Sequence, residues 1–144
     1  AAQRAIAGGS HEHQLVLHES LVAKRRTGGL SLDQADIDPL VGDQTQQALR
    51  RYHVDKAVMS CKGIDLESGV TDSSEFHSQT KQSMLRCAKT RILILDSSKF
   101  DKISFIDIAP LDVFDTIVTN AAPSKAWLDY FAEHGIECLY PGAK

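Results

Sequence analysis

The chain has 144 residues, 42% of them hydrophobic and 24% charged, which suits one globular domain with its own core. Its formal net charge of −3 argues against a surface that binds nucleic acid through clustered positive charge. The three cysteines, Cys61, Cys87 and Cys138, are odd in number and far apart, so they encode neither a disulfide framework nor a zinc knuckle. No apolar run approaches the roughly 20 residues of a membrane span. We therefore expect a cytoplasmic protein without a metal or cofactor.

The start of the chain, "AAQRAIAGG", has no initiator Met and is typical of the end of a helix closed by Gly8 and Gly9. It has neither the charged beginning nor the long apolar stretch of a signal peptide. We therefore expect residues 1–144 to be a single domain taken from a longer protein.

Strands and helices are predicted to alternate along the chain. Apolar runs bounded by turn residues predict strands at 13–20, 56–61, 91–95, 115–120 and 136–140. Apolar spacing and capping residues predict helices at 43–52, with Asp43 near its N-cap, at 75–89 and at 123–135. The apolar faces expected on these helices are, in turn, Ala48, Leu49 and Tyr52; Phe76, Met84, Cys87 and Ala88; and Trp127, Tyr130, Phe131 and His134. This alternation predicts an α/β fold with a mostly parallel sheet and helices on both faces.

The first polar segment, "SCKGID", follows the strand at 56–61 and contains Ser60, Cys61, Lys62, Gly63 and Asp65. Gly63 would let the backbone turn sharply and approach a ligand, and Lys62 supplies a point charge suited to an anion. An ordinary turn after a strand explains the segment about equally well.

The second polar segment, "GVTDSSEFHSQTK", precedes and opens the helix at 75–89. Four residues are N-cap candidates, Thr71, Asp72, Ser73 and Ser74, and the free N–H groups of a helix start attract anions. Glu75 and Lys81 follow within the helix. Plain helix capping is the more frequent explanation of such a segment.

The third polar segment, "DSSKF", follows the aliphatic run Ile92–Leu95, which has no polar alternation and therefore reads as a strand covered on both faces. Lys99 could bind a phosphate or a sugar hydroxyl, while Ser97 and Ser98 donate hydrogen bonds. The alternative makes Lys99 a surface ion-pair partner of Asp96 or Asp101.

The order and placement of the three segments are more informative than any one of them. Ligands of open α/β sheets bind in the crevice beyond the carboxyl ends of the strands. Polar groups that follow neighbouring strands therefore predict a pocket for a small polar molecule.

These segments resemble the effector-binding, or sensor, domain of the DeoR family of bacterial transcriptional regulators. The resemblance rests on a Gly-Ile-Asp turn at 63–65, a Gly-Val-Thr turn at 69–71, Glu75 with Lys81 six residues later, and Asp-Ser-Ser-Lys-Phe at 96–100. It covers roughly the last hundred residues, and the upstream part fits less tightly.

The resemblance implies a fold related to sugar-phosphate isomerases and coenzyme A transferases. It implies that a phosphorylated sugar or related metabolite binds the domain and controls DNA affinity, and that the protein is a homo-oligomer. It also implies an N-terminal helix-turn-helix that contacts operator DNA. The chain shows neither this motif nor the first strand and phosphate loop of the family's sensor, in agreement with a fragment.

One position departs from the family pattern. Lys62 stands where the family and the related isomerases usually carry an acid, and a lysine is a poor base at neutral pH unless its pKa is strongly perturbed. Catalysis is therefore not expected. The alternative is a sugar-phosphate isomerase-like enzyme with Glu75 or Asp96 as the base and Lys81 or Lys99 holding the substrate.

Overall fold

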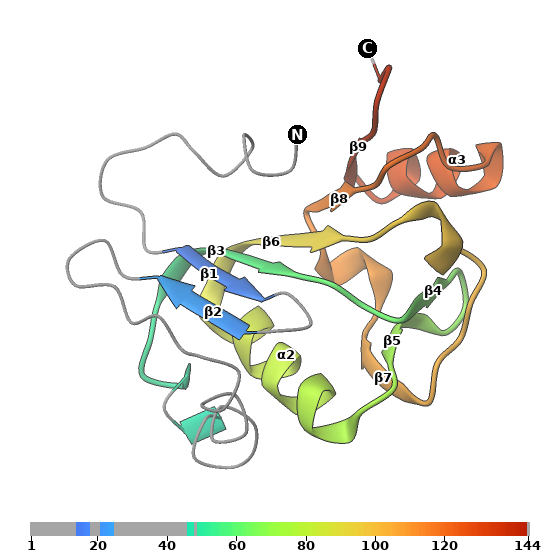
Figure 1. The fold of residues 1–144 in the computed structure, drawn as a ribbon. Coiled ribbons are helices and arrows are strands. Elements are labelled where there is room, and N and C mark those ends of the chain that lie inside the picture. The colour runs from blue at the N-terminus through green and yellow to red at the C-terminus, as the bar shows by residue number, and fades with distance from the viewer. Residues whose placement is uncertain (1–13, 18–20, 25–45, 48, 144) are drawn as a thin grey trace.

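A computed structural model of the chain describes residues 14–17, 21–24, 46–47 and 49–143, and for the first two ranges it describes the backbone only. Most of the described residues belong to two β-sheets and two α-helices (Figure 1). Asp43, Ala48 and the "AAQRAIAGG" segment lie outside this described part.

The main sheet has six strands in the order β2-β1-β3-β6-β8-β9. All neighbouring pairs are parallel except β1 and β2, which are antiparallel. In sheet order the strands are β2 (Leu21–Lys24), β1 (Gln14–Leu17), β3 (Val54–Met59), β6 (Ala88–Ile94), β8 (Thr116–Val118) and β9 (Glu137–Leu139). The predicted α/β class with a mostly parallel sheet is confirmed.

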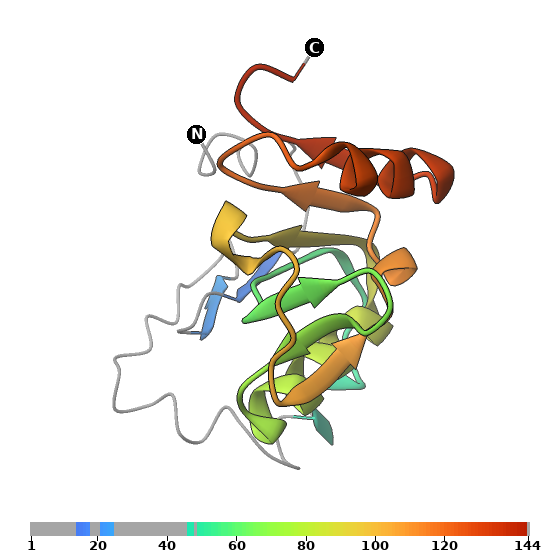
Figure 2. The ribbon, with the colours of Figure 1, turned by 90° about the vertical axis from the view of Figure 1, so that its right-hand side faces the viewer.

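A second, antiparallel sheet of three short strands lies beyond the carboxyl ends of β3 and β6 (Figure 1), and it faces the viewer in Figure 2. Its strands are β4 (Gly63–Asp65), β5 (Gly69–Asp72) and β7 (Ile106–Ala109). The sequence analysis treated the first two as turns, because three or four residues rich in Gly and Asp have a low strand propensity. They are strands because β4 pairs with β5 and β5 pairs with the distant β7.

Helix α2 (Glu75–Cys87) connects the two sheets. Ser74 caps its start by accepting a hydrogen bond of 3.5 Å from the backbone N–H of His77. The predicted apolar face is confirmed for Met84, which is fully buried, but Phe76 is 60% exposed. Phe76 lies in the first turn of α2, and its side chain does not join the buried residues of this helix. Ala88, predicted as helical, opens β6.

Helix α3 (Lys125–Glu133) is shorter than predicted, and Gly135 follows it with φ +67°, a conformation that glycine adopts without strain. Trp127 and Phe131 are buried as expected, whereas His134 is exposed and stacks on Tyr130 at 3.9 Å between ring centroids. Within the described residues, neither helix has the length and apolar character needed to cross a membrane.

Helical backbone at 46–47 and 49 confirms part of the predicted helix at 43–52. Leu49 packs against the core, but Tyr52 is 57% exposed and does not face it as predicted. Gln46 Nε2 donates a hydrogen bond of 2.8 Å to Gln79 Oε1 and so connects this segment to α2.

Both sheets share one hydrophobic core. Met59 and Leu93 from the main sheet, Ile64 and Val70 from the small sheet and Met84 from α2 all have 0% exposure. Because the small sheet buries its apolar residues against the main sheet, its position beyond the strand ends is fixed. Two short 3₁₀ helices, η3 (Ser97–Lys99) and η4 (Leu111–Val113), follow β6 and β7.

Gly63 lies where two backbone segments meet. A Cβ atom at this position would be 2.3 Å from the carbonyl oxygen of Lys102. The backbone N–H of Lys102 donates a hydrogen bond of 3.2 Å to the carbonyl of Ile64, next to Gly63. The close approach of the segment after η3 therefore excludes any side chain at position 63.

We predict that Gly63→Ala destabilises the fold by about 1–3 kcal/mol, because the added methyl group forces two hydrogen-bonded backbone segments apart. Glu67→Ala, an exposed change in the neighbouring turn, should stay within about 0.5 kcal/mol. Urea unfolding measures both. A Gly63→Ala variant as stable as the parent would contradict this account of the close approach.

Candidate functional site

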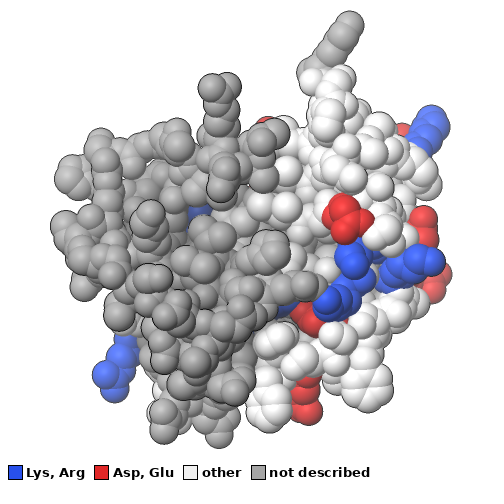
Figure 3. Space-filling view, in the orientation of Figure 1, with Lys and Arg blue, Asp and Glu red and all other residues white. Residues whose placement is uncertain are grey.

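The predicted site residues gather at one end of the main sheet. Ser60, Cys61 and Lys62 connect β3 to β4, and Asp96 with η3 follows β6. Because β3 and β6 are parallel neighbours, both segments leave the sheet at the same edge. On this side of the molecule, lysine or arginine side chains gather beside acidic ones (Figure 3).

A buried ion pair underlies this end of the sheet. Lys81 Nζ from α2 contacts Asp72 Oδ2 from the last residue of β5, and the two residues are only 7% and 2% exposed. Asp72 Oδ1 also accepts 2.7 Å from the backbone N–H of Ser73. Burial raises the pKa of Asp72, but the hydrogen bond and charge of Lys81 outweigh it and hold the pKa below the ordinary 3.8. The pair is therefore ionised at neutral pH.

Cys61 lies beside this pair and is 5% exposed. Burial raises the pKa of its thiol to about 12, although the charges of Lys81 and Lys99 act in the opposite direction. The thiol is therefore protonated at neutral pH and is a poor nucleophile.

Thr71 is fully buried and satisfies its hydroxyl within the small sheet. Its Oγ1 donates a hydrogen bond of 3.2 Å to the carbonyl of Gly63 and accepts one of 2.8 Å from the backbone N–H of Ser104. The Gly-Val-Thr motif therefore contributes a strand and a buried hydrogen-bond junction. Of the N-cap candidates in this segment, Ser74 is the one that caps α2, which confirms the plain-capping explanation for that residue.

Asp65 closes the turn between β4 and β5. Its Oδ1 accepts backbone N–H groups from Ser68 at 2.9 Å and Glu67 at 3.0 Å, which hold its pKa below the ordinary value. Lys62, the residue that departs from the family pattern, is half-buried, and its N–H donates 3.0 Å to the carbonyl of Thr71.

Asp96 organises η3. Its Oδ1 accepts from the Ser98 hydroxyl and from the Ser98 N–H at 2.9 Å, and these two bonds hold its pKa below the ordinary value. The preceding N–H, of Ser97, donates 2.7 Å to Oδ1 of Asn120. Both contacts fix the turn that carries Lys99.

Lys99 forms no ion pair with any residue that the structure describes. Its charge acts on Asp96 and Cys61, but Asp101 accepts a different hydrogen bond, 3.0 Å from Trp127 Nε1. The structure therefore does not contain the alternative ion pair of Lys99 with Asp96 or Asp101.

Glu75 is exposed in the first turn of α2, where its Oε1 accepts 3.3 Å from Gln79 Nε2. Among the described residues this is its only side-chain hydrogen bond. No group of three or more metal-ligating side chains exists within the described part of the chain.

Sequence reasoning missed Asn120, Asp101 and Trp127 as partners of the turn after β6. Asn120 closes the predicted strand at 115–120, so the same strand-end rule that found η3 could have found it. Asp101 and Trp127 had no such signal, because their contact joins a loop to a helix 26 positions along the chain.

The Asp72–Lys81 pair should be costly to break on one side only. We predict that Lys81→Met destabilises the fold by about 3–5 kcal/mol, because it leaves a buried carboxylate without its counter-charge. Asp72→Asn combined with Lys81→Met should recover much of this loss. Chemical unfolding measures the coupling. Lys89→Met, which removes the exposed Lys89–Asp55 pair at 3.4 Å, should cost under about 1 kcal/mol.

The stability difference between Lys81→Met and the parent should also depend on pH, in a direction that the pKa of Asp72 sets. Because the pKa of Asp72 is lowered by folding, this residue stabilises the native protein at pH values above 3.8, its pKa in the unfolded chain. The stabilisation is lost as the pH falls through the pKa of the folded protein. In Lys81→Met, burial, the largest influence, raises the pKa of Asp72 and is opposed only by the Ser73 hydrogen bond and the charge of His77. Acidification from pH 7 to 5 should therefore narrow the difference in Tm from the parent. A constant difference would contradict a buried, ionised pair.

The sequence comparisons agree with this geometry. The family profile described as the DeoR C terminal sensor domain matches residues 27–121. The "L-fucose operon activator" of Haemophilus influenzae is 30% identical over 84% of this chain and 48% of its own length. The "HTH-type transcriptional repressor GlcR" of Bacillus subtilis is 35% identical over 69% and 38% of the two chains.

A "Putative aga operon transcriptional repressor" of Escherichia coli O157:H7 is 28% identical over 96% of this chain and 51% of its own length. The chain thus spans about half, or less, of the curated relatives it matches. The profile match covers the strand-end segments built above, from "SCKGID" to "DSSKF". This chain belongs to the family of DeoR C-terminal sensor domains, the sensor part of DeoR-type transcriptional regulators.

Proposed function

We propose that this sensor domain binds a phosphorylated sugar, or a related anionic metabolite, at the carboxyl ends of β3 and β6, and that binding controls the DNA affinity of the regulator. Lys99 carries the proposal. It is a lysine without an ion-pair partner in the described chain, and it follows two serine hydroxyls at a strand end. An unpaired ammonium group at such a place is suited to a charge-assisted hydrogen bond with a phosphate.

The surrounding residues support an anion over a cation. Lys62 and Lys102 lie on the segments next to Lys99, while Asp65 and Asp96 direct carboxylate oxygens at backbone N–H groups. One carboxylate oxygen of each of these acids is therefore engaged by local hydrogen bonds, although both acids stay charged. The relatives named for fucose and aga operons agree with a sugar-derived effector.

The isomerase alternative needs a carboxylate that can remove a proton at neutral pH. The hydrogen bonds from Ser98 hold the pKa of Asp96 low, which makes it a weak base. Glu75 is exposed to solvent at the start of α2. A non-catalytic sensor therefore fits these residues better than an enzyme.

DNA contact, we infer, is made outside residues 1–144. The chain carries a net charge of −3, and it spans only 38% of the relative that is named as an HTH-type repressor. A regulator of this kind acts on the bacterial chromosome, which places the protein in the cytoplasm.

The intact regulator is also expected to be an oligomer, because paired half-sites on DNA require two recognition elements at a fixed spacing. Light scattering at micromolar concentration should return at least a dimer. A monomer under these conditions would contradict this part of the proposal.

Lys99→Ala in the intact regulator should weaken effector binding about ten- to a hundred-fold, since a hydrogen bond to a charged group contributes roughly 1.5–3 kcal/mol. The Tm should stay nearly unchanged, because Lys99 has no described ion-pair partner to lose. Titration calorimetry against hexose monophosphates and inorganic phosphate measures the effect. Lys125→Ala, which removes an exposed lysine of α3, is the control and should bind as the parent does.

Two outcomes would contradict the ligand site. One is unchanged affinity in Lys99→Ala together with a lower Tm, which would make the turn purely structural. The other is the absence of binding of any phosphate to the parent protein.

A further inference from the structure

Helix η3 is short and is held locally by its N-cap residue, Asp96. It consists of three residues, none of which is buried, and 3₁₀ geometry provides poor hydrogen bonds. The apolar residue that ends it, Phe100, is only partly buried. Something outside the helix must therefore fix the position of Lys99.

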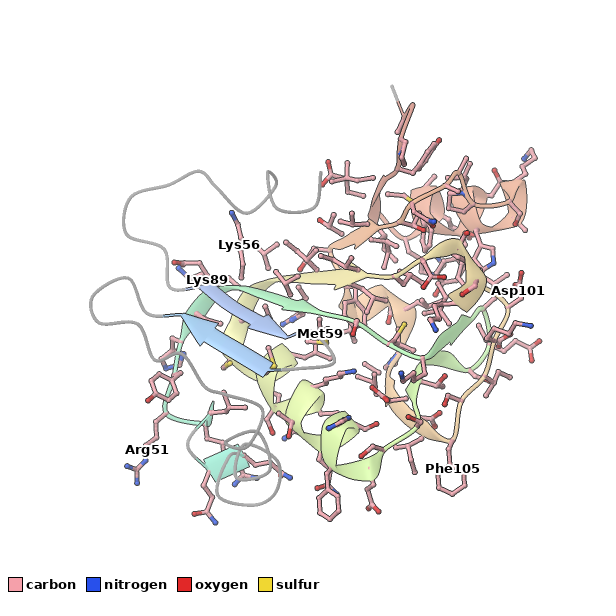
Figure 4. The ribbon with its side chains drawn as sticks, in the orientation of Figure 1. Arg51, Lys56, Met59, Lys89, Asp101 and Phe105 are labelled. Carbon is pink, nitrogen blue, oxygen red and sulfur yellow. The ribbon has the colours of Figure 1, made fainter. Side chains whose placement is uncertain are left out.

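Two side chains from other elements hold the segment on either side of Lys99. Before it, Asn120 Oδ1 accepts 2.7 Å from the N–H of Ser97. After it, Asp101 Oδ1 accepts 3.0 Å from Trp127 Nε1. Asn120 follows β8 and Trp127 lies on α3, so both contacts come from the part of the chain that carries α3. Asp101, labelled in Figure 4, lies on the same side of the molecule as α3.

The Asp101 contact is anchored in the core. Trp127 is 1% exposed, and its ring packs edge-on against Phe100 with 5.0 Å between centroids. A buried indole N–H needs an acceptor, and the only acceptor it has within the described chain is Asp101. Two consecutive residues after Lys99 are thus held by one buried side chain.

Asp101 also has an unusual backbone conformation. Its φ of +55° makes it the only non-glycine residue with positive φ in the described chain. Asp and Asn tolerate this region better than other side chains, whereas Ala is strained there. The turn from Lys99 to Lys102 therefore depends on Asp101 in two ways that can be tested separately. One is the positive φ of its backbone, and the other is the hydrogen bond of its carboxylate.

We propose that Asp101 is a positioning residue for the effector site, which sets the direction of Lys99 through its hydrogen bond to Trp127 of α3. This inference rests on the proposed function. It adds that affinity depends on a residue that does not itself contact the ligand, and that α3 is mechanically connected to the site. Binding of a ligand to Lys99 should then change the fluorescence of Trp127, which is the only tryptophan of the chain.

Three substitutions in the intact regulator separate the contributions of Asp101. Asp101→Asn keeps the acceptor and the tolerance of positive φ. Asp101→Gly keeps only the backbone freedom, and Asp101→Ala loses both. Asp129→Ala, an exposed acid of α3 paired with Lys125, is the matched control.

Hydrogen–deuterium exchange of the backbone amides at 97–102 tests the positioning without any ligand. We expect faster exchange in Asp101→Ala and Asp101→Gly, and exchange like the parent in Asp101→Asn and Asp129→Ala. Equal exchange in all variants would overturn the inference even if phosphates bind.

Titration with inorganic phosphate and glucose 6-phosphate, followed by calorimetry and by Trp127 fluorescence, tests the connection to the site. Asp101→Ala and Asp101→Gly should bind about tenfold more weakly and lose the fluorescence change, while Asp101→Asn should retain both. Faster exchange with unchanged affinity would overturn the inference, since Asp101 would then be merely structural.

The two proposals fail differently. If the parent protein binds neither phosphate, the proposed function is wrong and no effector site remains for Asp101 to position, although the exchange data still decide whether it holds η3. If the parent binds and Lys99→Ala does not, but all Asp101 variants bind equally, only the positioning role is wrong.

Discussion

The buried ion pair between Asp72 and Lys81 is the interaction on which the arrangement of this domain depends. It joins the last residue of β5 to the middle of α2, and both partners are nearly inaccessible to water. A charge in such a place is tolerated only while its partner is present. The pair therefore fixes the small sheet relative to the helix that packs on the main sheet, and it sets the environment of Cys61.

A second constraint follows from where the small sheet lies. Because β4 leads directly out of β3, and the chain after η3 returns to bond with Ile64, the two strand-end segments are in backbone contact. Gly63 permits this approach. The Gly-Ile-Asp and Asp-Ser-Ser-Lys-Phe motifs are thus parts of one structural unit, and within it Lys99 forms no ion pair with any described residue.

The proposed effector site is built on turns that its own polar side chains hold together. Thr71, Asp65 and Asp96 use their oxygens on backbone N–H and carbonyl groups, so they stabilise turns and strands. A binding site built on such turns can couple ligand contact to the elements that hold the turns. Among the described residues, α3 is connected in this way through Trp127. A catalytic site would instead need a free, basic carboxylate.

The sequence by itself determined the parallel strands, both helices and the three polar segments, because hydrophobic periodicity and strand-end placement are local signals. It could not show that residues 63–65 and 69–72 are strands, since these short segments become strands by pairing with each other and, through β5, with the distant β7. Nor could it show that Phe76 is exposed, because the spacing of apolar residues does not say where a helix leaves the core. The partners of each charged side chain were likewise decided by the tertiary structure: Lys81 pairs with Asp72, and Asp101 binds Trp127 and leaves Lys99 without an acid. Electrostatic partners are chosen by distance in space, which only the packed chain defines.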